Sequence, residues 1–433
     1  MPSPARSPGG ISPPVGADPD RPSPAVASRR ARPADVPVVV AVGLFVALGL
    51  PDGVLGTVWP SLRDDLGATQ SGLGFLAAAA TTGYVAASLT SGRVAARLGP
   101  GSTLAAGAAV GVVALTGIAA SPAWAAVVAA HLLLGVSLGT VDAGGNAWMA
   151  LARGPGPLHL LHAGFGVGAT AGPLVATAFV ADADPGRWRW AYASVVVVQL
   201  MALVAVVATR HRFAPTSTRV AARGGAAPTG HRGGGDRDDE HRGGVPRRRL
   251  LTLVLVWFAV YVGAEVAVGQ WTFTLFTEGR GWRDAHAGVL VATYWGGLLA
   301  GRVVVGLVGE RLDLDRLQHR STLMAAAAAV VLWLDPAGAG WTAVPVLGLG
   351  FATLFPLMVN RTPTLVGRDA TATTVGRQLA ASAAGMTGAP LAIGILADRR
   401  GIQVAPVAVV VLTVALTLVW WAIRRFGGVG APS

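Results

Sequence analysis

Three carboxylates stand inside long apolar stretches of the sequence: Asp52, Asp142 and Glu265. A charge at the bilayer centre costs about 2.5–3.5 kcal/mol on insertion scales, so such residues persist where they face a bundle interior or water. Burial favours the protonated form of a carboxyl group, which suits it to carry a proton. We expect one or more of these acids to bind a proton, or a sodium ion, and so to bias the protein between two conformations. The alternative is a hydrogen-bonded acid that fixes helix packing.

The first of these acids lies in the string Pro51-Asp52-Gly53, which predicts a break in a helix where Asp52 caps the freed amides. Counting about 1.5 Å per residue from the centres of the apolar stretches separates Asp52 and Asp142 by about 13 Å in height. The two acids would therefore act in successive states rather than share one site. The same separation argues against an intramembrane enzyme built on a carboxylate dyad.

Amide and tryptophan side chains could complete a site for a hydroxylated solute. Asn146 follows Asp142 by four residues, which puts both side chains on one face of a helix. Amides exchange hydrogen bonds with hydroxyl groups, and a tryptophan offers a face on which a sugar ring stacks. The alternatives are helix packing and, for tryptophan, anchoring at the membrane interface. The predicted substrate-binding residues are Asn146, His162, Gln270, Trp271, Asn360 and Gln378.

Other chemistry is excluded by residue types that the chain lacks. It contains no cysteine and no lysine, so thiolate metal sites, cysteine nucleophiles and a Walker A lysine are ruled out. His159 and His162 are three residues apart, but no third metal ligand is close in sequence, and His162 is expected to bond across helices or to sense pH. We expect no enzyme activity, no metal and no cofactor, with a proton or sodium gradient as the driving force.

The elements that would position these residues are membrane-spanning helices. Of the 433 residues, 52% are apolar and 13% are charged, about half the usual charged share of a soluble domain. Each apolar run is long enough for the ~20 residues that cross ~30 Å of hydrocarbon. The sequence predicts an all-α membrane protein with twelve spans, at residues 37–60, 70–91, 101–120, 124–150, 158–181, 188–209, 250–276, 286–308, 319–336, 341–361, 372–397 and 402–424.

Charge distribution orients these spans. With both termini inside, 27 of the 34 arginines, Arg302 among them, fall in inner segments. This bias indicates a multi-pass protein of the cell membrane with cytoplasmic termini. The net charge of +12 does not indicate nucleic-acid binding, because the arginines lie in the gaps between apolar runs. The predicted parts are a disordered tail at 1–35, six-helix bundles at 36–209 and 250–424, a cytoplasmic linker at 210–249 and a tail at 425–433.

The two bundles carry the same residues at a nearly constant offset. A duplicated six-helix unit on either side of a linker is the parallel-repeat plan of secondary transporters, which hold substrate near the midplane. The matched pairs, 212 to 214 residues apart, are Asp52 and Glu265, Gly56 and Gly269, Trp59 and Trp271, Gly135 and Gly348, and Asn146 and Asn360.

A short string between the second and third spans resembles the loop motif of the major facilitator superfamily. It runs from Gly92 to Gly99, and Ala96 stands where the motif usually has an acid. The second bundle has a copy that keeps an acid and a base. The predicted residues of this conformational loop motif are Gly92, Arg93, Arg97, Gly99, Glu310 and Arg311.

Within that superfamily, three strings resemble the fucose-permease and sodium-dependent-glucose-transporter-like branch: residues 139–146, 162–166 and 265–271. The resemblance implies two pseudo-symmetric six-helix bundles, a monomer, and roles in proton coupling and sugar contact for the acids of the first and fourth helices. His131 stands where the drug antiporters of the superfamily have an arginine in the fourth helix, which argues against that group. In the other direction, Gly168 to Pro173 resembles the antiporters' fifth-helix motif.

We therefore expect a secondary active transporter that moves a small solute by alternating access. A sugar-like solute in symport with protons is the first hypothesis, and a proton-coupled efflux antiporter for drugs or metabolites is the alternative. A receptor or scaffold of the same shape is a further alternative. The expected partners are the solute and the lipid bilayer. The solute's identity, the direction of transport and the choice between proton and sodium stay open.

Overall fold

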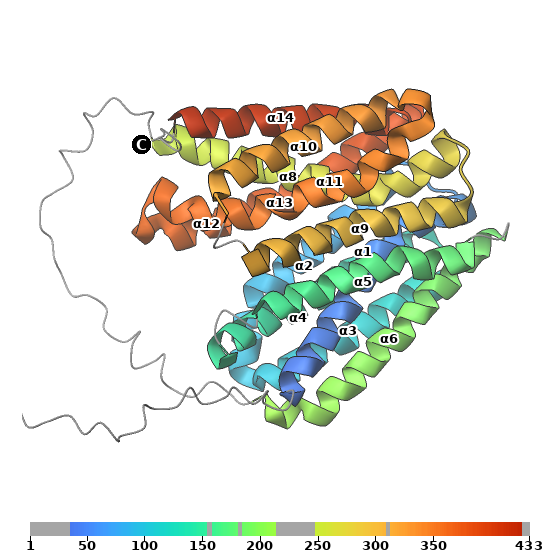
Figure 1. Cartoon of the computed structure of the whole chain (residues 1–433). Coiled ribbons are helices and arrows are strands. Elements are labelled where there is room, and N and C mark those ends of the chain that lie inside the picture. The colour runs from blue at the N-terminus through green and yellow to red at the C-terminus, as the bar shows by residue number, and fades with distance from the viewer. Residues whose placement is uncertain (1–34, 154–157, 181–183, 214–246, 309–311, 427–433) are drawn as a thin grey trace, which may run out of the picture. The chain divides into compact units, whose positions relative to one another are not determined.

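Every regular element in the described residues is a helix (Figure 1). The computed structural model describes residues 35–153, 158–180, 184–213, 247–308 and 312–426. The long helices are α1 (Val36–Leu66), α2 (Gly72–Leu98), α3 (Pro100–Ala120), α4 (Trp124–Arg153), α5 (Leu158–Val180), α6 (Trp188–Thr209), α8 (Arg247–Thr274), α9 (Asp284–Val308), α10 (Leu314–Leu334), α11 (Ala343–Ala352), α12 (Leu354–Val366), α13 (Arg368–Arg400) and α14 (Val404–Phe426). Short helical turns are η1 (Pro185–Arg187), η2 (Arg210–Arg212), η3 (Leu275–Gly279) and η5 (Pro336–Thr342).

Eleven helical segments of the described residues are long and apolar enough to cross a membrane. One of them, Pro336–Val366, combines η5, α11 and α12. The predicted run at 319–336 forms α10, which is not among the eleven. Its first turns carry the polar side chains of Gln318, His319 and Arg320, which lower the hydropathy of the whole helix.

The expected loop motif after the second span is mostly helical. Gly92, Arg93 and Arg97 belong to the last turns of α2, and only Gly99 separates α2 from α3. Alanine, leucine and arginine favour the helix, and nothing breaks it before Gly99, which has a φ of 80° and is followed by a proline that starts α3. Glu310 and Arg311 lie outside the described residues.

The predicted helix break at Asp52 is wrong, because α1 runs unbroken through Pro51. Its glycines pack directly on α5: a Cβ at Gly49 would lie 2.0 Å from the backbone oxygen of Phe165, and one at Gly53 would lie 2.3 Å from that of Ala169. This close contact outweighs the hydrogen bond that a proline removes from a helix. Asp52 therefore has no freed amides at its own position to cap.

Helix contacts among residues 36–213, the first half, recur among residues 247–426, the second half. α1 packs on α5, α2 on α4 and α3 on α6, and α8 packs on α13, α9 on α11 and α10 on α14. A Cβ at Gly135 would lie 1.9 Å from the Ala80 oxygen, and one at Gly348 would lie 2.2 Å from the Tyr294 oxygen. These two contacts are related by offsets of 213 and 214 residues, so the sequence repeat extends to the packing.

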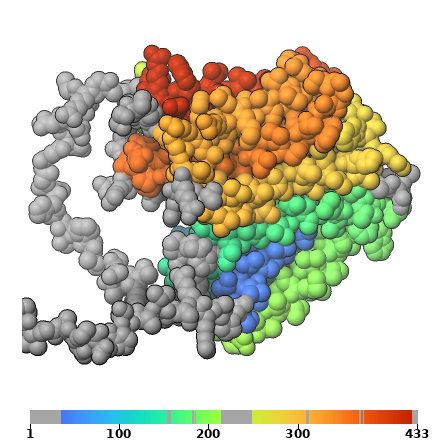
Figure 2. All heavy atoms as spheres, in the orientation of Figure 1, coloured from blue at the N-terminus to red at the C-terminus, as the bar shows by residue number. Residues whose placement is uncertain are grey.

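The halves meet where α5 packs on α9, α2 on α13 and α1 on α8. Figure 2 shows the α5 and α9 surfaces side by side. The first two contacts are equivalent under the repeat, since α2 corresponds to α9 and α5 to α13. At the third contact a Cβ on Gly56 would lie 3.0 Å from the oxygen of Gly269, its own repeat counterpart.

We predict that Gly49→Leu destabilises the fold by about 3 kcal/mol or prevents it, because the new side chain would overlap the α5 backbone. Gly43→Leu is the matched control in the same helix, since a Cβ there meets nothing within 4 Å. Thermal unfolding of the purified protein in detergent measures both. Equal melting temperatures for the two variants would contradict the packing described for α1 and α5.

Candidate functional site

Asp142 lies in a hydrogen-bonded cluster between α2 and α4. Its Oδ2 accepts a hydrogen bond from the Tyr84 hydroxyl at 2.7 Å, and its Oδ1 accepts one from Asn146 Nδ2 at 2.8 Å. The close approach of α2 to α4 requires glycine at position 139, because a Cβ there would lie 2.3 Å from the Tyr84 backbone oxygen. The predicted shared face of Asp142 and Asn146 is confirmed. The Asn146 Oδ1 is buried without a partner among the described residues.

Glu265 lies in a second cluster, between α8 and α9. Arg302 Nη2 approaches its two carboxylate oxygens at 3.3 and 3.4 Å, and the Tyr261 hydroxyl donates to Oε2. The Tyr294 hydroxyl donates to the Glu265 backbone oxygen at 2.6 Å. The assignment of Arg302 to an inner segment between spans is therefore wrong, because Arg302 lies inside α9. A guanidinium at that position needs a counter-charge, and Glu265 supplies it.

His162 interacts electrostatically with a charged residue of each of these clusters. It is on α5, its ring centroid is 6.3 Å from that of Phe45, and its side chain is exposed. Asp142 and Arg302 both act on it electrostatically. Because Asp142 belongs to the first half and Arg302 to the second, His162 is the predicted residue that is within reach of charged groups from both halves.

Asp52 is exposed although its neighbours on the same face of α1 are buried. Leu48, Leu55 and Trp59 have exposed fractions of 3%, 8% and 0%. A single exposed residue among buried neighbours three, four and seven positions away indicates a recess between helices rather than a lipid-facing surface. Asp52 interacts electrostatically with the buried Tyr192.

Several polar atoms near the contact of α1, α8 and α9 are buried without hydrogen-bond partners among the described residues. They are Gln270 Oε1, Trp271 Nε1 and Trp295 Nε1. Gly56 of α1 packs against the Gln270 backbone, and Gly269 packs against the Trp295 ring. Buried polar groups in native proteins are almost always satisfied, so one acceptor and two donors here require water or a bound molecule.

The remaining two predicted amides differ in their surroundings. Gln378 on α13 is buried, and its Nε2 donates to the Thr362 hydroxyl of α12 at 2.8 Å, so its amide holds two helices together. Asn360 on α12 is exposed. Among the described residues, neither is joined by a hydrogen bond to the Asp142 or the Glu265 cluster.

Sequence reasoning missed four residues that complete the clusters: Tyr84, Tyr261, Tyr294 and Arg302. Three of the four tyrosines, Tyr84, Tyr261 and Tyr294, donate hydrogen bonds to a predicted acid. Tyr261 precedes Glu265 by four residues and shares its helix face, so the sequence carried that signal. Tyr84 and Arg302 act across helices, and no local pattern marks such pairs.

The string Gly135-Val-Ser137-Leu-Gly139 has the spacing found around a hydrolase nucleophile. It lies inside α4, however, rather than at a strand-to-helix turn. Ser137 is buried and donates to the Gly107 oxygen at 2.8 Å. The serine therefore ties α4 to α3 and is not exposed for reaction.

The halves are also joined by hydrogen bonds at one end of the helices, which we call the α1–α2 end after the junction found there. Arg63 Nη1 and Gln70 Nε2 donate to Glu278 Oε2 at 3.1 and 3.0 Å. The Gln70 and Ser71 backbone amides donate to the two oxygens of Asp398 at 2.6 and 3.1 Å. Among the described residues, no side-chain hydrogen bond joins the halves at the opposite, α2–α3 end. We call the group Arg63, Gln70, Ser71, Glu278 and Asp398 the latch.

Two open hollows lie on the surface of the described residues. One of about 480 Å³ lies between α13 and α14, and one of about 620 Å³ is lined by residues of α9 and by Trp341 and Pro345. Neither contains a predicted site residue. The recess at Asp52 is therefore indicated by the exposure of that side chain and not by either hollow.

Known proteins resemble this chain in sequence and in fold. The family model described as the Major Facilitator Superfamily matches residues 41–377. Sodium-dependent glucose transporter 1 of Homo sapiens is 25% identical over 261 residues, which is 53% of this chain and 48% of that protein. The match thus spans about half the length of that relative.

Two solved structures have a similar fold. The inward-open xylose transporter XylE from E. coli has a TM-score of 0.68 and 14% identity, covering 90% of this chain and 95% of that one. The nucleoside transporter NupG, in the form of a point mutant, has a TM-score of 0.66 and 11% identity, covering 90% of this chain and 99% of that one.

We predict that Arg302→Gln lowers the free energy of unfolding by about 1–3 kcal/mol, because it leaves the Glu265 carboxylate without its counter-charge. Adding Glu265→Gln in the same chain should restore part of that loss. Thermal unfolding in detergent measures the single and double variants, and Arg283→Gln, an exposed arginine before α9, is the control. Purely additive effects of the two substitutions would contradict the ion pair.

Proposed function

The chain belongs to the Major Facilitator Superfamily and is a membrane transporter rather than an enzyme, and we propose that it moves a small hydroxyl-rich solute, sugar-like or nucleoside-like, in symport with protons. The observation that carries this proposal is the pair of carboxylate clusters, one in each half. Asp142 and Glu265 each sit in a span with hydrogen-bond partners, and His162 interacts electrostatically with Asp142 and with Arg302, the partner of Glu265.

The proposed organisation is two six-helix bundles, at 36–209 and 250–424, with the solute between them. The repeated helix contacts support it, because the same three helix pairs form in each half. In this organisation α10 completes the twelve spans. The arginine bias, which keeps its direction without Arg302, supports a cytoplasmic α2–α3 end in the cell membrane. The active unit is proposed to be a monomer.

Asp142 is better suited than Glu265 to carry the proton. Glu265 faces a guanidinium, so a proton on it would strand the positive charge of Arg302 inside a span. Asp142 is held by two neutral donors, Tyr84 and Asn146. A protonated Asp142 has a hydroxyl that must donate, so it can keep only one oxygen as a full acceptor. A proton on Oδ2 would only reverse the Tyr84 bond, because a phenol also accepts. A proton on Oδ1 would release the Asn146 bond, because an amide nitrogen cannot accept.

That release would couple the proton to the solute. The Asn146 amide, freed from Asp142, could bond a solute hydroxyl, while its Oδ1 already lacks a partner among the described residues. Gln270 Oε1 and the Trp271 and Trp295 N–H groups, which lie nearer the α1–α2 end, would offer the solute a second set of polar atoms. Hydroxyl groups both donate and accept, so they satisfy all of these atoms. An apolar drug would leave them unpaired at about 1–3 kcal/mol each, which disfavours the efflux alternative.

Alternating access would require the latch to open. The described conformation holds the α1–α2 end shut, since Glu278 and Asp398 each bind the first half. Asp398 accepts from the backbone amides of Gln70 and Ser71, just before the N-terminus of α2, where the helix dipole favours a negative charge. The cycle would break these bonds and close the α2–α3 end. A proton or sodium gradient would drive the cycle, with no cofactor.

We predict that Asp142→Asn abolishes uphill solute accumulation, because the amide cannot take up a proton, while downhill flux falls by less than about tenfold. Flux of a panel of labelled sugars and nucleosides into proteoliposomes, with and without a pH gradient, measures this. Asp284→Asn at the start of α9 is the control. Undiminished gradient-driven accumulation in Asp142→Asn would remove Asp142 from coupling.

We predict that Asp398→Asn loosens the α1–α2 end. Because the chain lacks cysteine, a single Ala78→Cys reports opening without background; it lies on the α2 face that Ser71 and Gly74 turn toward α13. In the Asp398→Asn protein this thiol should react about tenfold faster with a membrane-impermeant maleimide, since a charge-assisted bond is lost. Arg399→Gln is the adjacent control. Equal rates in all three proteins would show that Asp398 does not hold the latch.

A further inference from the structure

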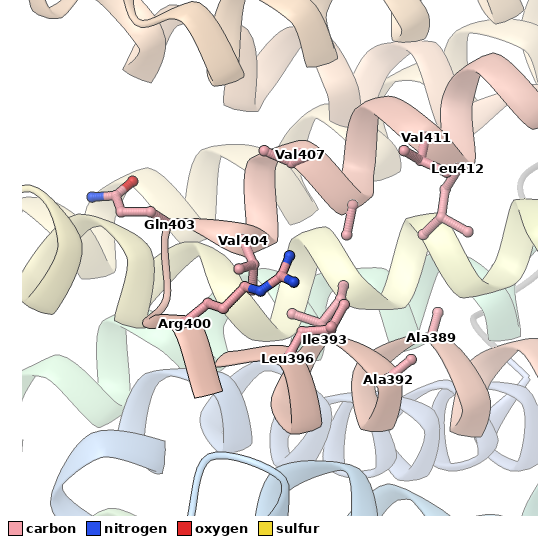
Figure 3. A pocket seen from close by; sticks show the side chains of 11 residues that line it. Ala389, Ala392, Ile393, Leu396, Arg400, Gln403, Val404, Val407, Val411 and Leu412 are labelled. Carbon is pink, nitrogen blue, oxygen red and sulfur yellow. The ribbon is translucent and has the colours of Figure 1, made fainter. Parts of the chain in front are cut away.

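A groove between α13 and α14 remains outside the site described above (Figure 3). On α13 it is lined at helical spacing by Ala389, Ala392, Ile393 and Leu396, and then by Arg400. On α14 the lining positions also follow helical spacing, at 404, 407, 408, 411 and 412. Two apolar stripes thus face each other, and the hollow between them measures about 480 Å³.

The groove exists because its two helices lean on different neighbours. α13 packs on α8 and α2, whereas α14 packs on α8 and α10. The tight turn at Gly401 joins them at one end, and alanines at 389, 392 and 408 leave room between the stripes. Ile393, 2% exposed, forms the floor, and Val411, 61% exposed, stands on the rim. The hollow therefore opens toward the surroundings of the protein.

Arg400 closes the groove at the turn. Its side chain reaches from the end of α13 between Val404 and Ile393 (Figure 3). Among the described residues no carboxylate pairs with it: the nearby Asp398 binds the Gln70 and Ser71 amides before α2, and the Gln403 amide donates to the Gly279 oxygen at 2.6 Å. Arg400 is exposed at the end of its helix and beside an apolar wall, so its guanidinium is free to bind an anion at the level of the headgroups.

The dimensions match one leaflet of a bilayer. From Ala389 to Arg400 the helix rises about 16 Å, close to half of the ~30 Å hydrocarbon thickness. The guanidinium stands where the helix ends, at the depth of the headgroups. α14 begins beside it at Val404, and the N-terminus of a helix favours a negative charge.

We propose that this groove binds an anionic phospholipid of the leaflet at the α1–α2 end, with one acyl chain between α13 and α14 and the phosphate on Arg400. Basic residues between membrane helices are the sites at which anionic lipid headgroups bind. A second copy of the chain is a poorer occupant, because a two-fold contact through the groove would bring two Arg400 side chains together.

Native mass spectrometry of the full-length protein, purified in detergent and incubated with equal amounts of phosphatidylglycerol and phosphatidylcholine, tests this proposal. The wild type should retain phosphatidylglycerol in preference, and Arg400→Gln should lower that retention about tenfold. Arg399→Gln, with the same loss of charge one residue away, should leave it unchanged. Ala392→Phe fills the groove without changing charge and should lower retention of both lipids.

Three outcomes would overturn the proposal. Equal retention of the two lipids by the wild type would remove the role of charge, and equal loss in Arg399→Gln and Arg400→Gln would show general surface attraction. A dimer peak that Ala392→Phe abolishes would assign the groove to a second copy. The melting temperature of each variant verifies folding, and Leu396→Phe offers a second way to fill the groove if Ala392→Phe does not fold.

Discussion

The structure depends on one constraint, which is that a charge inside the hydrocarbon needs either a protein partner or a recess that keeps it from lipid. Glu265 and Arg302 satisfy each other across α8 and α9, and Asp142 is satisfied by two neutral donors. Such pairs require helices that approach closely, and glycine supplies the approach. Gly139 brings α2 to Asp142. The glycines of the apolar spans are therefore as much a part of the site as the acids.

The helices could be predicted from the sequence because hydrocarbon imposes a length and a composition on any span. The predicted runs at 101–120, 124–150 and 188–209 differ from α3, α4 and α6 by at most three residues at either end. Errors arose where tertiary contact overrides local pattern. Pro51 does not break α1, because α5 holds both sides of it, and Arg93 and Arg97 extend α2 instead of forming a loop.

The site could be predicted only in part, because contacts between different helices leave no mark in the local sequence pattern. The spacing of Asp142 and Asn146 fixes their contact within one helix, so that bond was foreseeable. Of the partners of Glu265, Tyr261 shares its helix, whereas Arg302 and Tyr294 come from α9 and no local pattern marks them. Arg302 in particular lies near the end of its apolar run, where an arginine is normally taken to mark the cytoplasmic side of the membrane. Only the packing of α8 on α9 identifies it as a counter-ion.

The two halves carry different residues at positions that the repeat makes equivalent. Asp52 and Glu265 are repeat counterparts, yet Leu48, Ala80 and Ser88 stand in the first half where Tyr261, Tyr294 and Arg302 surround Glu265 in the second. Glu265 in the second half therefore has an ion-pair partner, whereas Asp52 in the first half has none among the described residues. The first half places its hydrogen-bonded acid elsewhere, at Asp142, whose position in the second half holds the apolar Phe355 or Pro356. In the proposed mechanism Glu265 keeps its ion pair with Arg302 while Asp142, held by neutral donors, takes up the proton, so the two bundles would respond differently to the same proton.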